Sequence, residues 1–176
     1  MESVILGLLI FQPLTIYDIN SAFKEGISLF YSASYGSIQT AIKKLLHKGF
    51  ITFTEGIENG RNKKTYSITK QGSEHFFCWM KSDIANRKNE SIISAKIYFL
   101  GLIEDIEDKK TILKDIIGIY EEMQSELSRI QEETSTIEID DSYKEIFKFK
   151  MKSLDYGLVS YAVSLKFYKD LLKDLG

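Results

Sequence analysis

The sequence predicts a mainly α-helical protein with one small β-hairpin. Over most of the chain the apolar residues recur at steps of three and four, as in amphipathic helices. Only residues 50–54 and 65–68 change to the alternation and the β-branched and aromatic composition that are typical of strands. With 176 residues and 44% hydrophobic content, the chain is long enough for one or two cores and is unlike a disordered protein.

We expect a cytoplasmic protein without a membrane span. The apolar run at residues 4–11 lacks a basic start and ends at Gln12-Pro13, so it is predicted to be a buried helix and not a signal peptide. No stretch approaches the roughly 20 apolar residues of a transmembrane helix. The single cysteine, Cys78, cannot form an internal disulfide and is expected to be buried as a small apolar residue.

The first two helices are predicted from their end signals. The first extends from about Glu2 to Phe11 and ends there because Pro13 disfavours helix at the residue before it. The second begins at Thr15, whose hydroxyl can cap it, with Asp18 in its first turn. Gly26 is expected to end it, and a loop follows.

A third helix, from about Ser34 to Lys48, is expected to expose a polar face. One apolar stripe turns toward the core and comprises Ile38, Ala41, Ile42, Leu45 and Leu46. The opposite face carries hydrogen-bonding residues first and cations later: Ser37, Gln39, Thr40, Lys43, Lys44, His47 and Lys48. This order suits a helix whose first turns contact base edges of DNA while its later lysines contact phosphates.

The hairpin after this helix has a basic tip. Asn59-Gly60 is a strong turn signal because both residues tolerate positive φ, and Arg61, Lys63 and Lys64 follow it. Three helices followed by such a hairpin form the pattern of a winged helix-turn-helix. Residues 34–72 carry 7 Lys/Arg against 2 Asp/Glu, whereas residues 73–176 carry 15 against 20. The local excess of cations favours a phosphate-binding surface, although a solvated charge cluster is the alternative.

The rest of the chain is predicted to be helical. Thr69 caps a fourth helix, and the polar stretch that follows it separates a DNA-binding domain at 1–82 from an α-helical domain at 90–176. The last helix has the clearest periodicity, with steps of four and three through Phe147, Met151, Leu154, Leu158, Tyr161, Leu165, Tyr168, Leu172 and Leu175. A heptad-like seam predicts helix pairing, and we assign its members from Phe147 to Leu172 to a dimer interface. The alternative is that two long helices of one chain satisfy each other. A second apolar row comprises Val159, Val163, Phe167 and Leu171.

The first 72 residues resemble the PadR family of bacterial transcriptional regulators. Each matching fragment is weak alone, but their order and spacing are fairly specific: Ile5-Leu6-Gly7-Leu8-Leu9, Pro13-Leu14, Tyr17-Asp18-Ile19, Gly36-Ser37-Ile38, Lys44-Leu45-Leu46-His47-Lys48-Gly49-Phe50-Ile51, and Gly60-Arg61 leading to Lys64-Thr65-Tyr66-Ser67-Ile68-Thr69-Lys70-Gln71-Gly72. The resemblance implies a homodimer that binds an inverted repeat in duplex DNA and responds in some members to small aromatic molecules. Two departures are Ile16, where the family often has Gly, and Gln39-Thr40, where it often has Tyr-Pro.

These observations lead to a DNA-binding transcriptional regulator, with repression as the expected sign, and not to an enzyme. The predicted DNA contacts are Tyr35, Ser37, Gln39, Thr40, Lys43, Lys44, Arg61, Lys63 and Lys64. A pocket for a small aromatic effector is a hypothesis for Phe76, Trp79 and Met80, with burial in the core as the alternative. We expect no cofactor and no metal, because neither histidine has partners at ligand spacing. The rival functions are a protein-interaction module without specific DNA binding and a small-molecule binder of the MarR type.

Overall fold

The computed structural model describes residues 1–58, 61–84 and 90–176, with the side chains of Glu58 and Arg61 outside the description. The chain divides into two compact units, Met1–Glu104 and Asp105–Gly176. Within the described residues, none of the helices combines the length and the hydropathy that crossing a membrane requires.

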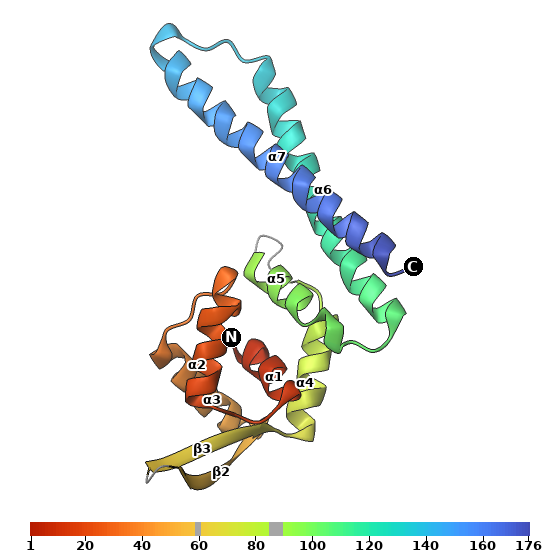
Figure 1. Ribbon diagram of the computed structural model, residues 1–176. Helices are drawn as coiled ribbons and strands as arrows, with labels where there is room; N and C mark the ends of the chain where they lie inside the picture. Colours follow the sequence, from red (N-terminus) through yellow and green to blue (C-terminus); the bar gives the residue numbers. More distant parts are fainter. Residues whose placement is uncertain (59–60, 85–89) are drawn as a thin grey trace. The chain divides into compact units, whose positions relative to one another are not determined.

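The first unit contains a small sheet among short helices (Figure 1). Its elements in chain order are α1 (Glu2–Phe11), β1 (Leu14–Thr15), α2 (Ile16–Glu25), η1 (Ile27–Leu29), α3 (Tyr35–His47), β2 (Ile51–Glu58), β3 (Arg61–Ile68), α4 (Lys70–Lys81), α5 (Glu90–Tyr98) and η2 (Leu100–Leu102). The mainly helical fold with a winged hairpin is therefore confirmed. The segment after α2, expected to be a loop, contains the 3₁₀ turn η1.

The predicted caps are present. The backbone N–H of Asp18 donates to the Thr15 hydroxyl at 3.2 Å, and the N–H of Thr15 donates to the Asp18 carboxylate at 2.8 Å, which forms a capping box at the start of α2. Ser34 accepts from the N–H of Ser37 at the start of α3, and Thr69 accepts from the N–H of Gly72 at the start of α4. Local sequence therefore sets where these three helices begin.

The sheet has three antiparallel strands in the order β1-β3-β2. Ile51 pairs with Ile68 at the base of the hairpin, and Glu58 pairs with Arg61 at its far end. Both strands are longer than predicted, and the hairpin extends away from the helices of the unit (Figure 1). The short strand β1, which was not predicted, pairs Leu14 with Tyr66. The predicted Asn59-Gly60 turn lies outside the described residues.

Two glycines hold the hairpin against the helices. Gly49 has φ +69° and ends α3 in a left-handed conformation that a side chain disfavours. Gly72 lies in the first turn of α4, where a Cβ would stand 2.0 Å from the backbone oxygen of Phe50. The backbone at Phe50, just before β2, and that of α4 can approach this closely only because position 72 lacks a side chain.

Helix α5 belongs to the first compact unit, although the sequence placed it after the boundary at 82–90. The reason is its apolar end: Phe99 is completely buried and packs edge-on against Phe76 of α4, with ring centroids 5.6 Å apart. A Cβ at Gly7 of α1 would stand 2.7 Å from the Phe99 ring. The division between the two compact units therefore falls after Glu104, beyond the polar stretch at 82–90 where the sequence predicted a domain boundary.

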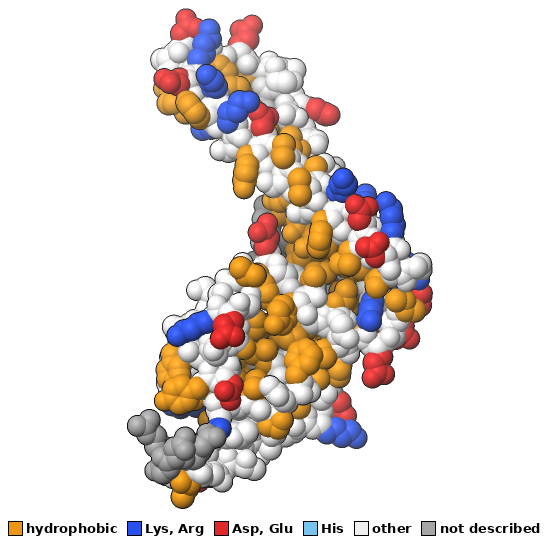
Figure 2. Space-filling view, in the orientation of Figure 1, with side chains coloured by type: hydrophobic (Ala, Val, Ile, Leu, Met, Phe, Trp, Pro, Cys, Tyr) orange, Lys and Arg blue, Asp and Glu red, His pale blue; other side chains and the backbone are white. Residues whose placement is uncertain are grey.

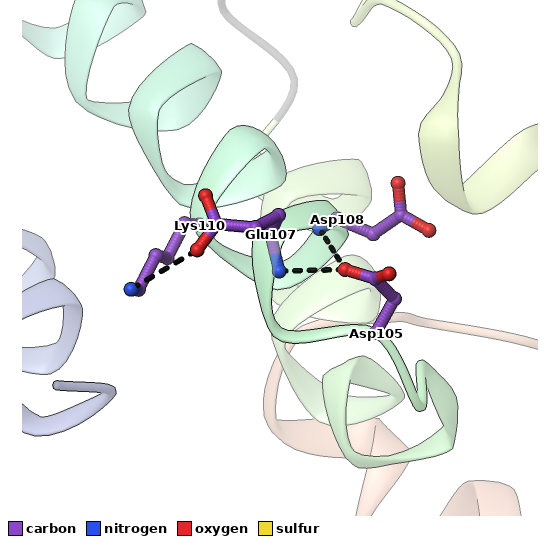
Figure 3. Close-up of polar contacts among 4 residues, drawn as sticks. All are labelled: Asp105, Glu107, Asp108 and Lys110. Carbon is purple, nitrogen blue, oxygen red and sulfur yellow. Dashed lines mark hydrogen bonds and ion pairs between the residues drawn. The ribbon is translucent and has the colours of Figure 1, made fainter.

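The second unit consists of α6 (Ile106–Ser135), the turn η3 (Asp141–Tyr143) and α7 (Lys144–Asp174). The Asp105 carboxylate caps α6 by accepting from the N–H groups of Glu107 at 2.7 Å and Asp108 at 3.1 Å (Figure 3). Lys110 pairs with Glu107 one turn later at 3.2 Å. Helices α6 and α7 then lie side by side along their length (Figure 1).

The heptad seam of α7 faces α6 of the same chain. Tyr120 of α6 contacts Tyr161 and Tyr168 with ring centroids 5.9 and 5.4 Å apart, and the Thr134 hydroxyl approaches the sulfur of Met151. The residues that we assigned to a dimer interface are all buried or half-buried: Phe147, Met151, Leu154, Leu158, Tyr161, Leu165, Tyr168 and Leu172. Pairing within the chain, the alternative left open by the sequence, therefore accounts for this seam.

A different row of α7 is exposed. Hydrophobic side chains lie on the surface of the second unit (Figure 2). Those of α7 that are most exposed are Ile146, Phe149, Tyr156, Val159, Val163 and Phe167. With the small residues Ser153 and Ser160, they form a second row at steps of three and four on a face away from the first seam.

Candidate nucleic-acid interface

Helix α3 exposes a polar face because its apolar stripe is fixed in the core of the first unit. Ile38 and Leu45 are completely buried, and Ala41 and Ile42 are nearly so. The side chains on the other side of the helix are exposed: Tyr35, Gln39, Thr40, Lys43, Lys44 and His47. Ser37, the remaining DNA contact predicted on this helix, is half-buried.

Two of the predicted hydroxyls are already engaged by the helix itself. The Ser37 hydroxyl donates to the backbone oxygen of Ser34 at 2.7 Å, and the Thr40 hydroxyl donates to the backbone oxygen of Gly36 at 2.9 Å. Their protons are therefore committed, and the Ser37 oxygen also accepts from the Ser34 hydroxyl at 3.2 Å. For an outside partner the two hydroxyls offer only their remaining acceptor capacity. Within the described part of the chain, no side chain hydrogen-bonds the amide of Gln39, which keeps its donor and acceptor for an outside partner.

A hollow of about 720 Å³ lies on one flank of α3. It is lined by residues from the start of α2, the first turns of α3 and strand β3: Thr15, Ile16, Tyr17, Asp18, Tyr35, Gln39, Asn62, Lys63, Lys64 and Tyr66. The pairing of β1 with β3 places the start of α2 directly beside the hairpin. The structure thus brings together predicted contacts from the helix and the hairpin on one surface.

Tyr17 is a residue of this surface that is not among the predicted DNA contacts. Its side chain is 73% exposed, and its ring lies 6.2 Å from the ring of Tyr35, tilted by 37°. In the sequence it belongs to Tyr17-Asp18-Ile19, one of the fragments that resemble the PadR family. The signal available in the sequence was an aromatic residue, next to Asp18, in the first turn of the helix that precedes α3.

The carboxylate of Asp18 is held within the same surface. The Thr15 hydroxyl donates to it at 2.7 Å, and this bond together with that from the Thr15 backbone N–H lowers the pKa of Asp18 below its ordinary value. The charge of Lys63 acts in the same direction. Asp18 is therefore ionised at neutral pH, with its charge partly offset by the hairpin cation.

The hairpin cations differ in their surroundings. Lys64 pairs with Glu55 across the two strands at 3.0 Å, and its ammonium lies 4.3 Å from the centre of the Phe53 ring. Lys63 is half-buried and lines the hollow. The side chain of Arg61, also predicted to contact DNA, lies outside the described residues.

A second hollow, of about 490 Å³, lies on the other flank of α3. It is lined by Met1, Glu2, Ser3, Ser37, Thr40, Ala41 and Lys44. The Glu2 carboxylate in this region is paired with Lys48 at 2.7 Å. The two hollows share no lining residue, and between them Lys43 and His47 are exposed along the helix.

The residues suggested for an effector pocket separate in the structure. Phe76 and Met80 are completely buried, so the core interpretation holds for these two residues. Trp79 is half-buried and lines a cavity of about 140 Å³ together with Tyr31 and Ile92, among other residues. The ammonium of the buried Lys96 lies 5.9 Å from the Trp79 ring and donates to the backbone oxygen of Ser82.

Two further expectations concern reactive and metal-binding groups. Cys78 was expected to be buried, but it is exposed on α4, because the buried face of this helix is occupied by Phe76 and Met80. Among the residues with described positions, no cluster of three His, Cys, Asp or Glu side chains has the geometry to hold a metal ion.

Sequence and structure comparisons with known proteins all find PadR regulators. The sequence profile of the "Transcriptional regulator PadR-like family" matches residues 5–76. The negative transcriptional regulator PadR of Bacillus subtilis (strain 168) is 31% identical, over 70% of this chain and 74% of that protein. The crystal structure of Bacillus subtilis PadR in complex with operator DNA is 25% identical, with 99% and 98% of the two chains covered and a TM-score of 0.46. Its complex with p-coumaric acid is 24% identical, with 99% and 97% covered and a TM-score of 0.42.

Proposed function

This chain belongs to the PadR-like family of transcriptional regulators, and from that premise we propose that it is a repressor that binds an inverted-repeat operator as a homodimer. The family consists of regulators and not of enzymes. Bacillus subtilis PadR is a negative regulator that has been crystallised with operator DNA. Duplex DNA is accordingly the partner proposed for this chain.

The observation that carries the proposal is the exposed polar face of α3 beside a basic hairpin. Gln39 offers an uncommitted amide near the start of the helix, where a helix in the major groove meets base edges. Lys43 and Lys44 follow one turn later, and Lys63 lines the adjoining hollow. We assign base contacts to the first turns of α3 and phosphate contacts to its lysines and to the hairpin.

DNA binding is tested by titrating labelled duplexes from the region upstream of the protein's own gene, and duplexes selected from a random pool. We expect specific binding whose affinity falls steeply with salt, because phosphate contacts release counterions. Lys63→Gln weakens binding to all sequences and lowers the salt slope by about one unit, whereas Gln39→Ala changes the preference among sequences. Absence of binding at low salt to every duplex contradicts the proposal.

The exposed row on α7 supports the proposed homodimer. An inverted repeat requires two DNA-binding units related by two-fold symmetry. The apolar row from Ile146 to Phe167 is not covered by α6, and a second copy of the same helix offers a matching row. We assign the dimer interface to this row in place of the seam at Phe147–Leu172. Light scattering on the full chain measures the oligomeric state, and a monomeric mass at micromolar concentration contradicts the assignment.

Release of DNA by a small aromatic effector is the remaining part of the proposal. Bacillus subtilis PadR has been crystallised with p-coumaric acid, and Trp79 and Tyr31 give this chain an aromatic-lined cavity. An effector acts only if it binds one conformation of the dimer more tightly than the other. Titration of the protein–DNA complex with p-coumaric acid tests this, with release of DNA as the expected result and unchanged binding at saturating ligand as the contrary one.

A further inference from the structure

Helix α3 lies between two hollows that are on opposite flanks of the helix. Tyr35 and Gln39, one turn apart, line the first hollow, and Ser37 and Lys44 line the second. At 3.6 residues per turn, Tyr35 and Ser37 point about 200° apart around the helix axis. Both hollows lie in the first compact unit, and each also contains residues of a neighbouring element.

The dimensions of DNA give this arrangement a meaning. The major groove is about 12 Å wide, and a helix with its side chains is about 10–12 Å across, so a helix inserted there fills the groove. The two sugar–phosphate backbones that border the groove must then lie against the two flanks of the helix. Hollows on both flanks provide the room that the backbones need.

We propose that each of the two hollows receives the backbone of one DNA strand. In the first hollow, the Tyr17 hydroxyl donates a hydrogen bond to a phosphate oxygen. This inference rests on the proposed DNA-binding function and adds to it a contact residue and a strand assignment. Lys63 and Asn62 contact the same strand as Tyr17, because all three line the first hollow. Lys44 contacts the opposite strand.

The environment of Tyr17 fits this role. Its ring is 73% exposed and lies 6.2 Å from the ring of Tyr35, so its phenol lines the hollow and is accessible to a phosphate. A tyrosine hydroxyl is a good donor to a phosphate, and its ring can cover the apolar face of a deoxyribose. Such a contact positions the protein without discriminating between bases.

The charges around the two hollows allow phosphates to approach. Asp18 is the acidic residue among the described residues that line the first hollow, and its carboxylate is engaged by Thr15 and lies in the field of Lys63. In the second hollow the carboxylate of Glu2 is neutralised by Lys48. The uncompensated charges that remain on α3 are the cations Lys43 and Lys44.

The experiment uses the full chain and a duplex that the wild-type protein binds specifically. Tyr17→Phe removes only the hydroxyl, and we expect about tenfold weaker binding, the typical effect of losing one hydrogen bond to a charged group. The salt slope stays unchanged because no cation is lost, whereas Lys44→Gln lowers it by about one unit. Tyr143→Phe, an exposed tyrosine of the second unit, is the matched control and binds as the wild type does.

The strand assignment is tested with duplexes that carry one neutral methylphosphonate at each backbone position in turn. Within one half-site of the inverted repeat, one position on one strand should reduce the effect of Tyr17→Phe to less than threefold, and a position on the other strand should do the same for Lys44→Gln. Two-fold symmetry repeats this pattern with the strands exchanged in the second half-site. Wild-type affinity of Tyr17→Phe, or coupling of both variants to the same strand within one half-site, overturns the inference while DNA binding stands. Failure of the wild-type protein to bind any duplex instead removes the proposed function.

Discussion

Val163 offers a quantitative test of the proposed dimer surface. Its side chain is 64% exposed in the single chain and lies toward the C-terminal end of the apolar row of α7. Complete burial of a valine side chain contributes about 1.5–3 kcal/mol, so covering the exposed fraction contributes about 1–2 kcal/mol in each protomer. Because the position occurs twice in a symmetric dimer, its total contribution is about 2–4 kcal/mol.

The substitution Val163→Glu removes this contribution and adds the cost of burying a charge. We therefore expect the dissociation constant of the dimer to rise by at least about 30-fold and up to about 1,000-fold. Sedimentation equilibrium over a range of concentrations measures this constant. Val163→Leu, which keeps an apolar side chain, and Ser125→Glu, which adds the same charge at an exposed position of α6, serve as controls and remain dimeric.

The result that refutes the reasoning is a Val163→Glu variant that dimerises as tightly as the wild type. Circular dichroism checks that the variant remains helical, as we expect because position 163 is exposed and lies outside the seam of α7 that packs against α6. A variant that is monomeric should also bind an operator half-site with the wild-type preference while losing affinity for the full inverted repeat. Equal affinity for both DNAs in the wild-type protein contradicts the link between dimerisation and operator binding.

Three further predictions concern the first unit, whose unfolding is followed by the fluorescence of the single tryptophan, Trp79. Thr15→Ala removes the cap of α2 and is expected to lower the free energy of unfolding by about 1 kcal/mol, as measured by urea titration. An unchanged urea midpoint of unfolding contradicts the capping role. Since the pKa of Asp18 is depressed in the folded state, its stabilising contribution is present above pH 3.8 and is lost as the pH falls through the lower folded-state pKa. Asp18→Asn should therefore flatten the acid limb of a stability–pH curve, and an unaltered limb counts against this assignment. Phe76→Ala empties a completely buried site between aromatic rings and is expected to cost about 3–5 kcal/mol, whereas a loss below about 1 kcal/mol indicates that the site is not a packed core.

Local signals in the sequence predicted the winged part of the fold closely. Thr15, Ser34 and Thr69 mark the starts of α2, α3 and α4 because a side-chain oxygen can bond the free N–H groups of the first turn. Gly49 marks the end of α3 because the chain turns there with a positive φ. These interactions join residues that are close in sequence, so a single sequence contains the information.

Features that depend on distant pairing were not predicted. Strand β1 is only two residues long, and its identity comes from its partner Tyr66 on β3 and not from its own composition. The first hollow, and with it the exposed Tyr17, follows from that pairing. Likewise, the placement of α5 depends on Phe99 meeting Phe76, a contact between segments that are separated by the polar stretch.

The two apolar rows of α7 illustrate the same limit in the part that we assign to dimerisation. Heptad spacing in the sequence shows that a row needs a partner helix, but it does not show which helix supplies it. The turn η3 follows α6 after a short connection, so α7 returns along α6 and its regular seam, including Leu165 and Tyr168, is satisfied within the chain. One helix can cover only one flank of its neighbour. The row through Tyr156, Val163 and Phe167 therefore remains exposed. If the dimer interface is built on this row, substitutions on this face of α7 weaken dimerisation, whereas substitutions at exposed positions outside it do not.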